Sequence, residues 1–179
     1  MKVSKFLGTI GFVAACLTVG FAQAGVMVSV DAQANSLRDG VALNTGIELV
    51  AGQHLTITVD PAQIWSFGPG NSEYEVTADG KAGWGMDATN PDGSTFIGMI
   101  GSLVGQIGTG TANAGDFFVI GTNFDGFANA SGTLNLFFWD SDAWNNDGAV
   151  NAVVSVPEPV SMALFGLGLL ALARTRRRV

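Results

Sequence analysis

The sequence has almost no cysteine and almost no histidine: Cys16 is its single cysteine and His54 its single histidine. Cys16 lies in an N-terminal apolar stretch, so the chain beyond it can form no disulfide, no zinc–thiolate site and no cysteine nucleophile. The fold must therefore be stabilised by burial of apolar side chains. The many valine, isoleucine, leucine, phenylalanine and tryptophan residues make such a core feasible.

Positive charge is scarce in the centre of the chain. Of the 8 lysines and arginines, only Arg38 and Lys81 fall within residues 25–156, against 14 acidic residues in the same stretch. This stretch has the size of one domain and carries about twelve net negative charges. Such a surface repels phosphate backbones, which excludes nucleic acid as a partner, and it attracts cations such as calcium.

The N-terminus has the composition of a secretory signal peptide. Two lysines in the first five residues precede an apolar run at 6–21, and the small residues Ala22 and Ala24 occupy the positions that signal peptidase inspects. We therefore expect residues 1–24 to be removed by cleavage after Ala24. Two alternatives remain: a retained membrane anchor, and a lipobox in which Cys16 would be lipidated and begin the mature chain.

The C-terminus combines a Pro-Glu-Pro sequence, an uncharged apolar stretch of 14 residues at 160–173, and a cluster of arginines. A helix of that length rises about 21 Å, short of the roughly 30 Å hydrocarbon core, so it is a poor permanent anchor. The arginines should stay in the cytoplasm while everything before them faces outward. The residues concerned are Pro157, Glu158, Pro159, Arg174, Arg176, Arg177 and Arg178.

This arrangement closely resembles the PEP-CTERM sorting signal of Gram-negative bacteria, over about the last 23 residues. The resemblance implies a short transmembrane helix that holds the chain transiently in the inner membrane. It also implies processing near Pro157-Glu158-Pro159 by an exosortase, a membrane-embedded transpeptidase-like enzyme, and release to the cell surface or extracellular matrix. An ordinary tail anchor is the alternative, and it would not explain the Pro-Glu-Pro sequence.

Between the two ends, short runs of β-branched and aromatic residues alternate with glycine-containing turns, and no long stretch has apolar residues at helical spacing. The pattern predicts a single all-β domain, a jelly roll or β-sandwich. One of the expected turns is Asp125-Gly126. The expected strands are residues 26–30, 47–50, 54–59, 74–77, 96–100, 103–107, 117–120, 133–139 and 150–156.

Two of these strands indicate which side chains face the core. In residues 54–59 apolar and polar residues alternate, so Leu55, Ile57 and Val59 should face inward from a strand whose other face is solvated. Residues 133–139 carry large apolar side chains on both faces, which predicts a central strand.

No arrangement of residues indicates catalysis. His54 lies on the polar face of an ordinary strand, no serine sits in a nucleophile elbow, and the carboxylates are scattered among turns, where they usually serve turn geometry. We therefore expect a protein that is not an enzyme.

Potential ligands are concentrated in residues 139–148. This loop between two expected strands holds three carboxylates and two amide oxygens within eight residues, and two tryptophans, one of them Trp144. Calcium takes six to eight oxygen ligands from flexible loops of this kind, and an exposed aromatic ring is a platform for a sugar. The spacing is not that of an EF-hand. The alternative is a solvated acidic loop with two packed tryptophans.

The order of motifs between about residues 44 and 156 is similar to that of small calcium-dependent galactose-binding bacterial lectins, which are jelly rolls. The shared motifs are Gly-Gln at 52–53, Trp-Ser-Phe-Gly-Pro at 65–69, Leu-Val-Gly-Gln-Ile-Gly at 103–108, Ser-Gly-Thr-Leu at 131–134 and the loop at 140–148.

In that family calcium is bound by an Asp, two Asn and main-chain carbonyls. The resemblance therefore implies Asp140, Asn145, Asn146 and the carbonyl of Phe67 as ligands. The loop is about two residues shorter here, so Asp142 is the substitute for the missing loop carbonyl.

The sugar contacts implied by the resemblance are Asn90, Asp92 and Trp144. The family's His-Pro-Asp-Gln sequence reads Asn90-Pro91-Asp92-Gly93 here, so galactose itself is not implied.

The sequence thus predicts a signal peptide at 1–24, an extracellular β-domain at 25–156 and a sorting signal at 157–179. Signal peptidase and an exosortase are the expected partners during export, and exopolysaccharide is the expected partner afterwards. The leading hypothesis is a cell-surface or matrix protein that binds calcium and carbohydrate through residues 140–148. The alternative is a purely structural biofilm or adhesion component with no small ligand.

Overall fold

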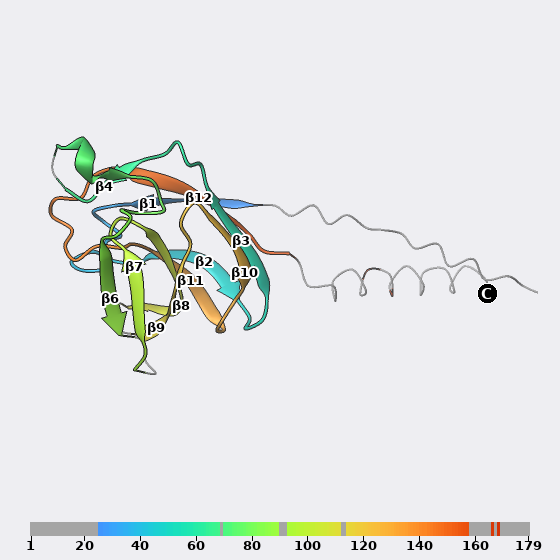
Figure 1. The fold of residues 1–179 in the computed structure, drawn as a ribbon. Helices are drawn as coiled ribbons and strands as arrows, with labels where there is room; N and C mark the ends of the chain where they lie inside the picture. Colours follow the sequence, from blue (N-terminus) through green and yellow to red (C-terminus); the bar gives the residue numbers. More distant parts are fainter. Residues whose placement is uncertain are drawn as a thin grey trace, which may run out of the picture.

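The domain consists of β-strands arranged in two facing sheets (Figure 1). The computed structural model describes residues 25–68, 70–89, 93–111 and 114–157, with Gly166 and Gly168. The expected signal peptide, with Ala22 and Ala24, and the sorting residues from Glu158 onward therefore lie outside the described part. Within that part, no helix is both long and apolar enough to cross a membrane.

Each main sheet has four antiparallel strands. Sheet A contains, in order, β1 (Val26–Asp31), β12 (Ala149–Ser155), β3 (His54–Val59) and β10 (Asn123–Phe127). Sheet B contains β2 (Leu43–Leu49), β11 (Gly132–Phe138), β8 (Leu103–Thr111) and β9 (Ala114–Val119). The first strand pairs with the last, β2 with β11 and β3 with β10, which is the nested order of a jelly roll.

Two short hairpins complete the domain. In the first, β4 (Trp65–Ser66) pairs with β5 (Glu75–Val76) around a 3₁₀ turn, η1 (Ser72–Tyr74). In the second, β6 (Gly85–Thr89) pairs with β7 (Thr95–Met99).

The main core lies between the two sheets. As the alternation in 54–59 predicts, Leu55, Ile57 and Val59 are buried, whereas Thr58 is exposed. They share one cluster with inward residues of sheet B, including Leu134. Burial of each such side chain stabilises the fold by about 1.5–3 kcal/mol, which is a large contribution in a domain without disulfides.

Strand β11 is central, as predicted, and both of its faces are buried. Phe137 and the adjacent Trp139 are not part of the main core; they pack with Phe96 and Phe117 in a second cluster. The hairpin β6–β7 supplies Phe96, and the indole nitrogen of Trp139 donates a hydrogen bond of 3.0 Å to the Met86 carbonyl. This hairpin therefore covers the outer face of sheet B.

The expected turn at Asp125-Gly126 is wrong, because both residues lie inside β10. The φ angle of Gly126 is not in the left-handed region that an Asp-Gly hairpin turn requires. Because Gly126 has no side chain, the ring of Phe124 can lie against it. A Cβ added at position 126 would be only 2.8 Å from Phe124 Cζ. Strands β4 and β6 were not expected from the sequence either.

The strand expected at 74–77 is shorter in the structure. Tyr74 ends the turn η1, and only Glu75 and Val76 form a strand. The side chain of Asn71 caps the turn by accepting a 3.0 Å hydrogen bond from the Glu73 amide, which holds Tyr74 out of the extended conformation.

The jelly roll has two ends that differ in what they carry. At the end where β1 begins and β12 ends, which we call the terminal end, the chain enters and leaves the domain (right in Figure 1). At the opposite end, which we call the loop end, residues 139–148 connect β11 to β12 (orange, left in Figure 1).

Candidate cation site

The loop at residues 139–148 is attached at both of its ends. Trp139 is fully buried and anchors its start. Near its end, Asp147 forms two main-chain hydrogen bonds with Ser66 of β4, at 2.8 and 3.0 Å, and the Ala32 amide donates to the Gly148 carbonyl at 2.9 Å. The loop is therefore held against both β4 and the segment that follows β1.

The interior of the loop is organised by hydrogen bonds to main-chain carbonyls. The side-chain amide of Asn146 donates to the Asp142 carbonyl at 2.8 Å and to the Ala32 carbonyl at 3.3 Å. The hydroxyl of Ser36 donates to the same Asp142 carbonyl at 2.9 Å. Since that carbonyl already accepts two hydrogen bonds, Asp142 has its side chain rather than its main chain available for a ligand.

Four side-chain oxygens of this loop are buried and accept no hydrogen bond from the described part of the chain. They are Oδ2 of Asp140 and Oδ1 of Asp142, Asn145 and Asn146. A buried acceptor without a donor costs about 1–3 kcal/mol, so four of them in one loop require an explanation. A bound cation is one kind of group that satisfies oxygens of this type.

The electrostatics of Asp140 agree with this arrangement. Burial raises the pKa of its carboxyl from 3.8 to about 6, and the neighbouring Asp142 carboxylate adds to the increase. The Ser141 amide, which donates to Asp140 Oδ1 at 2.7 Å, and the Asn146 side chain oppose it. Asp140, Asp142 and Asn146 are therefore neighbours, and no salt bridge to either carboxylate is found in the described part of the chain.

The donor set fits a hard cation. In the described ranges no three His, Cys, Asp or Glu side chains come together, so a metal site here must use amide oxygens as well as carboxylates. Two carboxylates and two amides give an all-oxygen set, which suits calcium and does not suit zinc or copper.

Phe67, whose carbonyl the resemblance implies as a further ligand, is next in the chain to a residue that binds the end of the loop. It follows Ser66, the partner of Asp147, and its own amide donates to the Tyr74 carbonyl at 3.2 Å. Its ring is buried and contacts the rings of Tyr74 and Trp84, at centroid distances of 5.3 and 5.8 Å. These contacts hold the Phe67 main chain beside the loop.

The two tryptophans of the loop differ. Trp139 is buried in the second cluster, while Trp144 is 75% exposed. The expectation of two packed tryptophans is thus wrong for Trp144, whose indole is available to a ligand. Asn90 and Asp92, the other candidate sugar contacts, lie outside the described residues.

His54 lies away from this loop, at the terminal end of sheet A. Its Nε2 is 2.7 Å from Asp125 Oδ1, and its ring meets that of Phe127 at a centroid distance of 5.3 Å. The residues that sequence reasoning did not identify are Ser36, Ala32 and Ser66. Ser66 belongs to the motif at 65–69, whereas Ala32 and Ser36 lie in a segment that carries no sequence signal for contact with the loop.

Comparison with known proteins identifies the C-terminal segment. Residues 155–178 match the family model described as the PEP-CTERM protein-sorting motif. The chain therefore carries this sorting signal, which implies processing by an exosortase and export to the cell surface. A search of curated proteins found no match.

Among solved structures, the chain is similar to one described as "EclA N-terminal domain; PllA-like lectin". The identity is 22%, the TM-score is 0.52, and the likeness covers 75% of this chain and 97% of that chain. A likeness at this level shows the fold. The chain thus joins a sorting motif that implies an exosortase to a jelly-roll domain whose fold is similar to that of this lectin domain.

Proposed function

We propose that this protein is a non-enzymatic component of the cell surface or extracellular matrix whose domain binds calcium through residues 139–148 and carbohydrate through the bound calcium. The observation that carries the proposal is a set of four buried oxygens, in Asp140, Asp142, Asn145 and Asn146, that have no donor within the described ranges.

Calcium fits this set better than magnesium does. Calcium accepts six to eight oxygen ligands in flexible geometry, whereas magnesium demands a near-ideal octahedron and keeps several waters. The four side chains and the Phe67 carbonyl supply five oxygens. Two adjacent hydroxyls of a sugar would complete the coordination, so the cation itself would serve as the recognition element.

Trp144 supports the carbohydrate part of the proposal. An indole that is 75% exposed on the same loop can stack on the apolar face of a sugar ring. The ligand is expected to be neutral, because the domain carries about twelve net negative charges and repels acidic polysaccharides.

The calcium part is tested by calorimetry and thermal denaturation on the mature protein released from cells. We expect a calcium-dependent rise in Tm that is lost in Asp140→Ala. Asp147→Ala is the matched control, because Asp147 is an exposed carboxylate of the same loop that only accepts from the Gly148 amide. No calcium heat in the wild-type protein would refute the proposed ligand.

The carbohydrate part is tested by retention on immobilised neutral polysaccharides with calcium and with EDTA. We expect calcium-dependent retention that falls in Trp144→Ala. If calcium binds but no polysaccharide is retained, the protein is instead a structural adhesion component, and substitutions in the loop should leave biofilm cohesion unchanged.

A further inference from the structure

The terminal end of the jelly roll has no charge on its tip. Strand register brings several segments together at this end. β1 begins beside the end of β12, and β10 ends beside the start of β3. The β2–β3 connection lies beside the start of β11. Hydrogen bonds of 2.8 Å between Gly52 and Ala128 and between Ala128 and Gln53 join two of the loops. Residues 25–27, 50–53, 127–132 and 153–157 contain no ionisable side chain.

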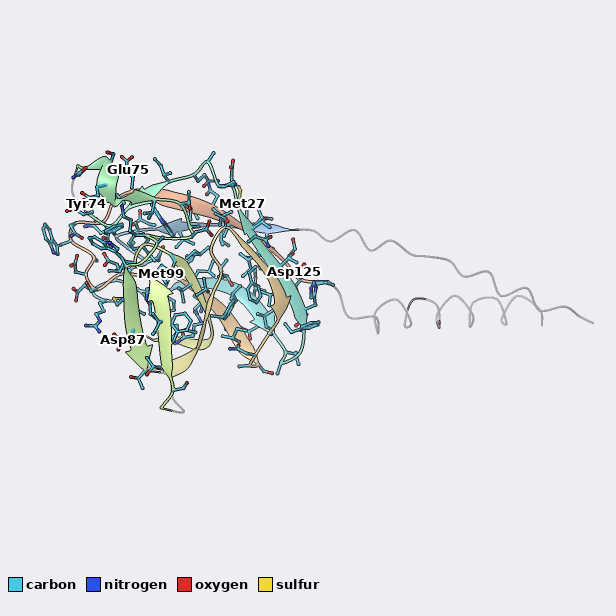
Figure 2. All side chains as sticks on the ribbon, viewed as in Figure 1. Met27, Tyr74, Glu75, Asp87, Met99 and Asp125 are labelled. Atoms are coloured by element: carbon cyan, nitrogen blue, oxygen red, sulfur yellow. The ribbon has the colours of Figure 1, made fainter. Side chains whose placement is uncertain are left out.

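This end also exposes large apolar side chains. Val26, Met27, Val50 and Phe127 are between 48% and 69% exposed. Figure 2 shows Met27 on the side of the domain where the chain enters and leaves. Four such side chains around an uncharged tip form a surface that favours an apolar partner.

The nearest carboxylates with described side chains are engaged. Asp125 contacts His54 at 2.7 Å, and Glu48 accepts a hydrogen bond from the Thr133 hydroxyl. Both belong to strands rather than to the tip, so the negative charges that they carry lie back from the end of the domain.

The loop end differs in charge rather than in apolar exposure. It exposes Val41, Ile64 and Trp144, but it also carries carboxylates that are exposed or half-buried. These carboxylates are Asp31, Asp60, Asp142 and Asp147. A bacterial membrane is anionic and would repel this end of the domain.

The position of the sorting signal selects the partner. β12 ends at Ser155 and the sorting motif covers 155–178, so no linker separates the terminal end from the sorting signal. Val156 still packs against the main core. Whatever surface holds the sorting signal must therefore meet the terminal end.

We propose that the terminal end is a lipid-docking surface. While the precursor is held by its sorting signal, Val26, Met27 and Val50 lie with Phe127 in the headgroup region of the bilayer, where apolar side chains enter about 5–10 Å deep. This contact keeps Pro157 at the membrane surface, where a membrane-embedded protease can reach it. The seven residues of β12 place the candidate cation site about 23 Å farther out. The inference depends on the membrane-held stage of export and not on calcium.

The test uses the precursor, residues 25–179, from cells that lack exosortase activity, in vesicles of phosphatidylethanolamine and phosphatidylglycerol. Residues 25–179 contain no cysteine, so Val50→Cys, in the β2–β3 connection, and Asp60→Cys, directly after β3, each accept one fluorophore. With spin-labelled lipids, we expect quenching by about half at position 50 and by less than about a tenth at position 60. Equal quenching at both positions, or none at position 50, would overturn the docking surface.

A second pair of variants separates docking from anchoring. With the fluorophore on Met27→Cys, Val50→Glu should reduce quenching several-fold, because a carboxylate resists entry into an anionic interface. Val41→Glu, at a valine of the loop end that is 75% exposed against 65% for Val50, should leave quenching unchanged. Circular dichroism verifies that both variants fold. A precursor that does not float with vesicles would refute the membrane-held stage itself, whereas one that floats without quenching refutes docking alone.

Discussion

The side-chain amide of Asn146 donates a 2.8 Å hydrogen bond to the main-chain carbonyl of Asp142. This contact uses the nitrogen of the amide, and the oxygen is buried with no donor among the described residues. The same residue thus braces the loop and, in the proposed function, would supply a ligand oxygen from a position that is already fixed.

The two asparagines of the loop should separate bracing from coordination. Asn146→Ala removes the hydrogen bonds to Asp142 and Ala32, and we expect it to lower the free energy of unfolding in EDTA by about 1–3 kcal/mol. Asn145→Ala should weaken calcium binding with little change in EDTA. Urea denaturation with and without calcium measures both effects. Equal losses of stability in EDTA would contradict the assigned roles.

The raised pKa of Asp140 predicts how stability depends on pH. Its carboxyl has a pKa of about 6 in the fold against 3.8 ordinarily, so the folded state holds the proton more tightly. The stability of the calcium-free protein should therefore fall as the pH rises from about 4 to 6, and remain level above that range. Calcium should remove this fall, because it compensates the ionised carboxylate.

The control for this prediction is Asp140→Asn, which cannot ionise. In EDTA, the Tm of this variant should rise relative to that of the wild-type protein as the pH increases from about 4 to about 6. These bounds correspond to the ordinary and the folded pKa of Asp140. A difference that does not change with pH would contradict the environment described for Asp140.

Gly98→Ala should disturb the attachment of the β6–β7 hairpin. An added Cβ would lie 2.7 Å from the indole nitrogen of Trp139, which is fully buried. We expect a loss of about 1–3 kcal/mol in the free energy of unfolding, because a tightly packed ring cannot move aside. In the control Gly85→Ala, the Cβ meets only a methyl group of Ile97 at 3.1 Å, so the loss should be smaller.

Trp65→Phe should affect the scaffold of the site. The Trp65 indole donates a buried 2.8 Å hydrogen bond to the Gly101 carbonyl, and its ring packs edge-on against Phe138 at a centroid distance of 4.6 Å. The variant leaves that carbonyl without its donor and should cost about 1–3 kcal/mol, measured by chemical denaturation. Since β4 carries Ser66, calcium affinity should also fall.

Replacement of Pro157, Glu158 and Pro159 by alanine should block release of the protein. We expect the variant to remain in the membrane fraction at the mass of residues 25–179, while the wild-type protein is recovered from the medium at a lower mass. Intact-mass spectrometry of both fractions measures this. The control is Ser155→Ala, inside β12. Normal release of the alanine variant would contradict the role assigned to the sorting sequence.

Much of the fold follows from local sequence patterns. The alternation in 54–59 correctly predicted the buried face of β3, and the two-sided apolar pattern in 133–139 correctly predicted a central strand. The pattern failed in β10, where Asp125-Gly126 is typical of a turn. There, pairing with β3 determines the conformation, because the long-range ladder outweighs a local turn preference.

The candidate site was only partly predictable. Asp140, Asp142, Asn145 and Asn146 could be selected because oxygen-bearing residues are concentrated in one loop. Their burial, and the absence of donors for their oxygens within the described residues, could not be read from the sequence. The loop oxygens are arranged by contacts with Ala32 and Ser36, and these two residues contact the loop only when β1 is paired with β12.

The sequence by itself determined the all-β class, the sorting signal and the acidic, thiol-free character of the domain, because composition and local periodicity are sufficient for these properties. Only the tertiary structure decided which loop oxygens are buried and which ends of the strands share a surface. Those properties depend on strand register, which juxtaposes residues far apart in the chain and is set by the packing of the whole core.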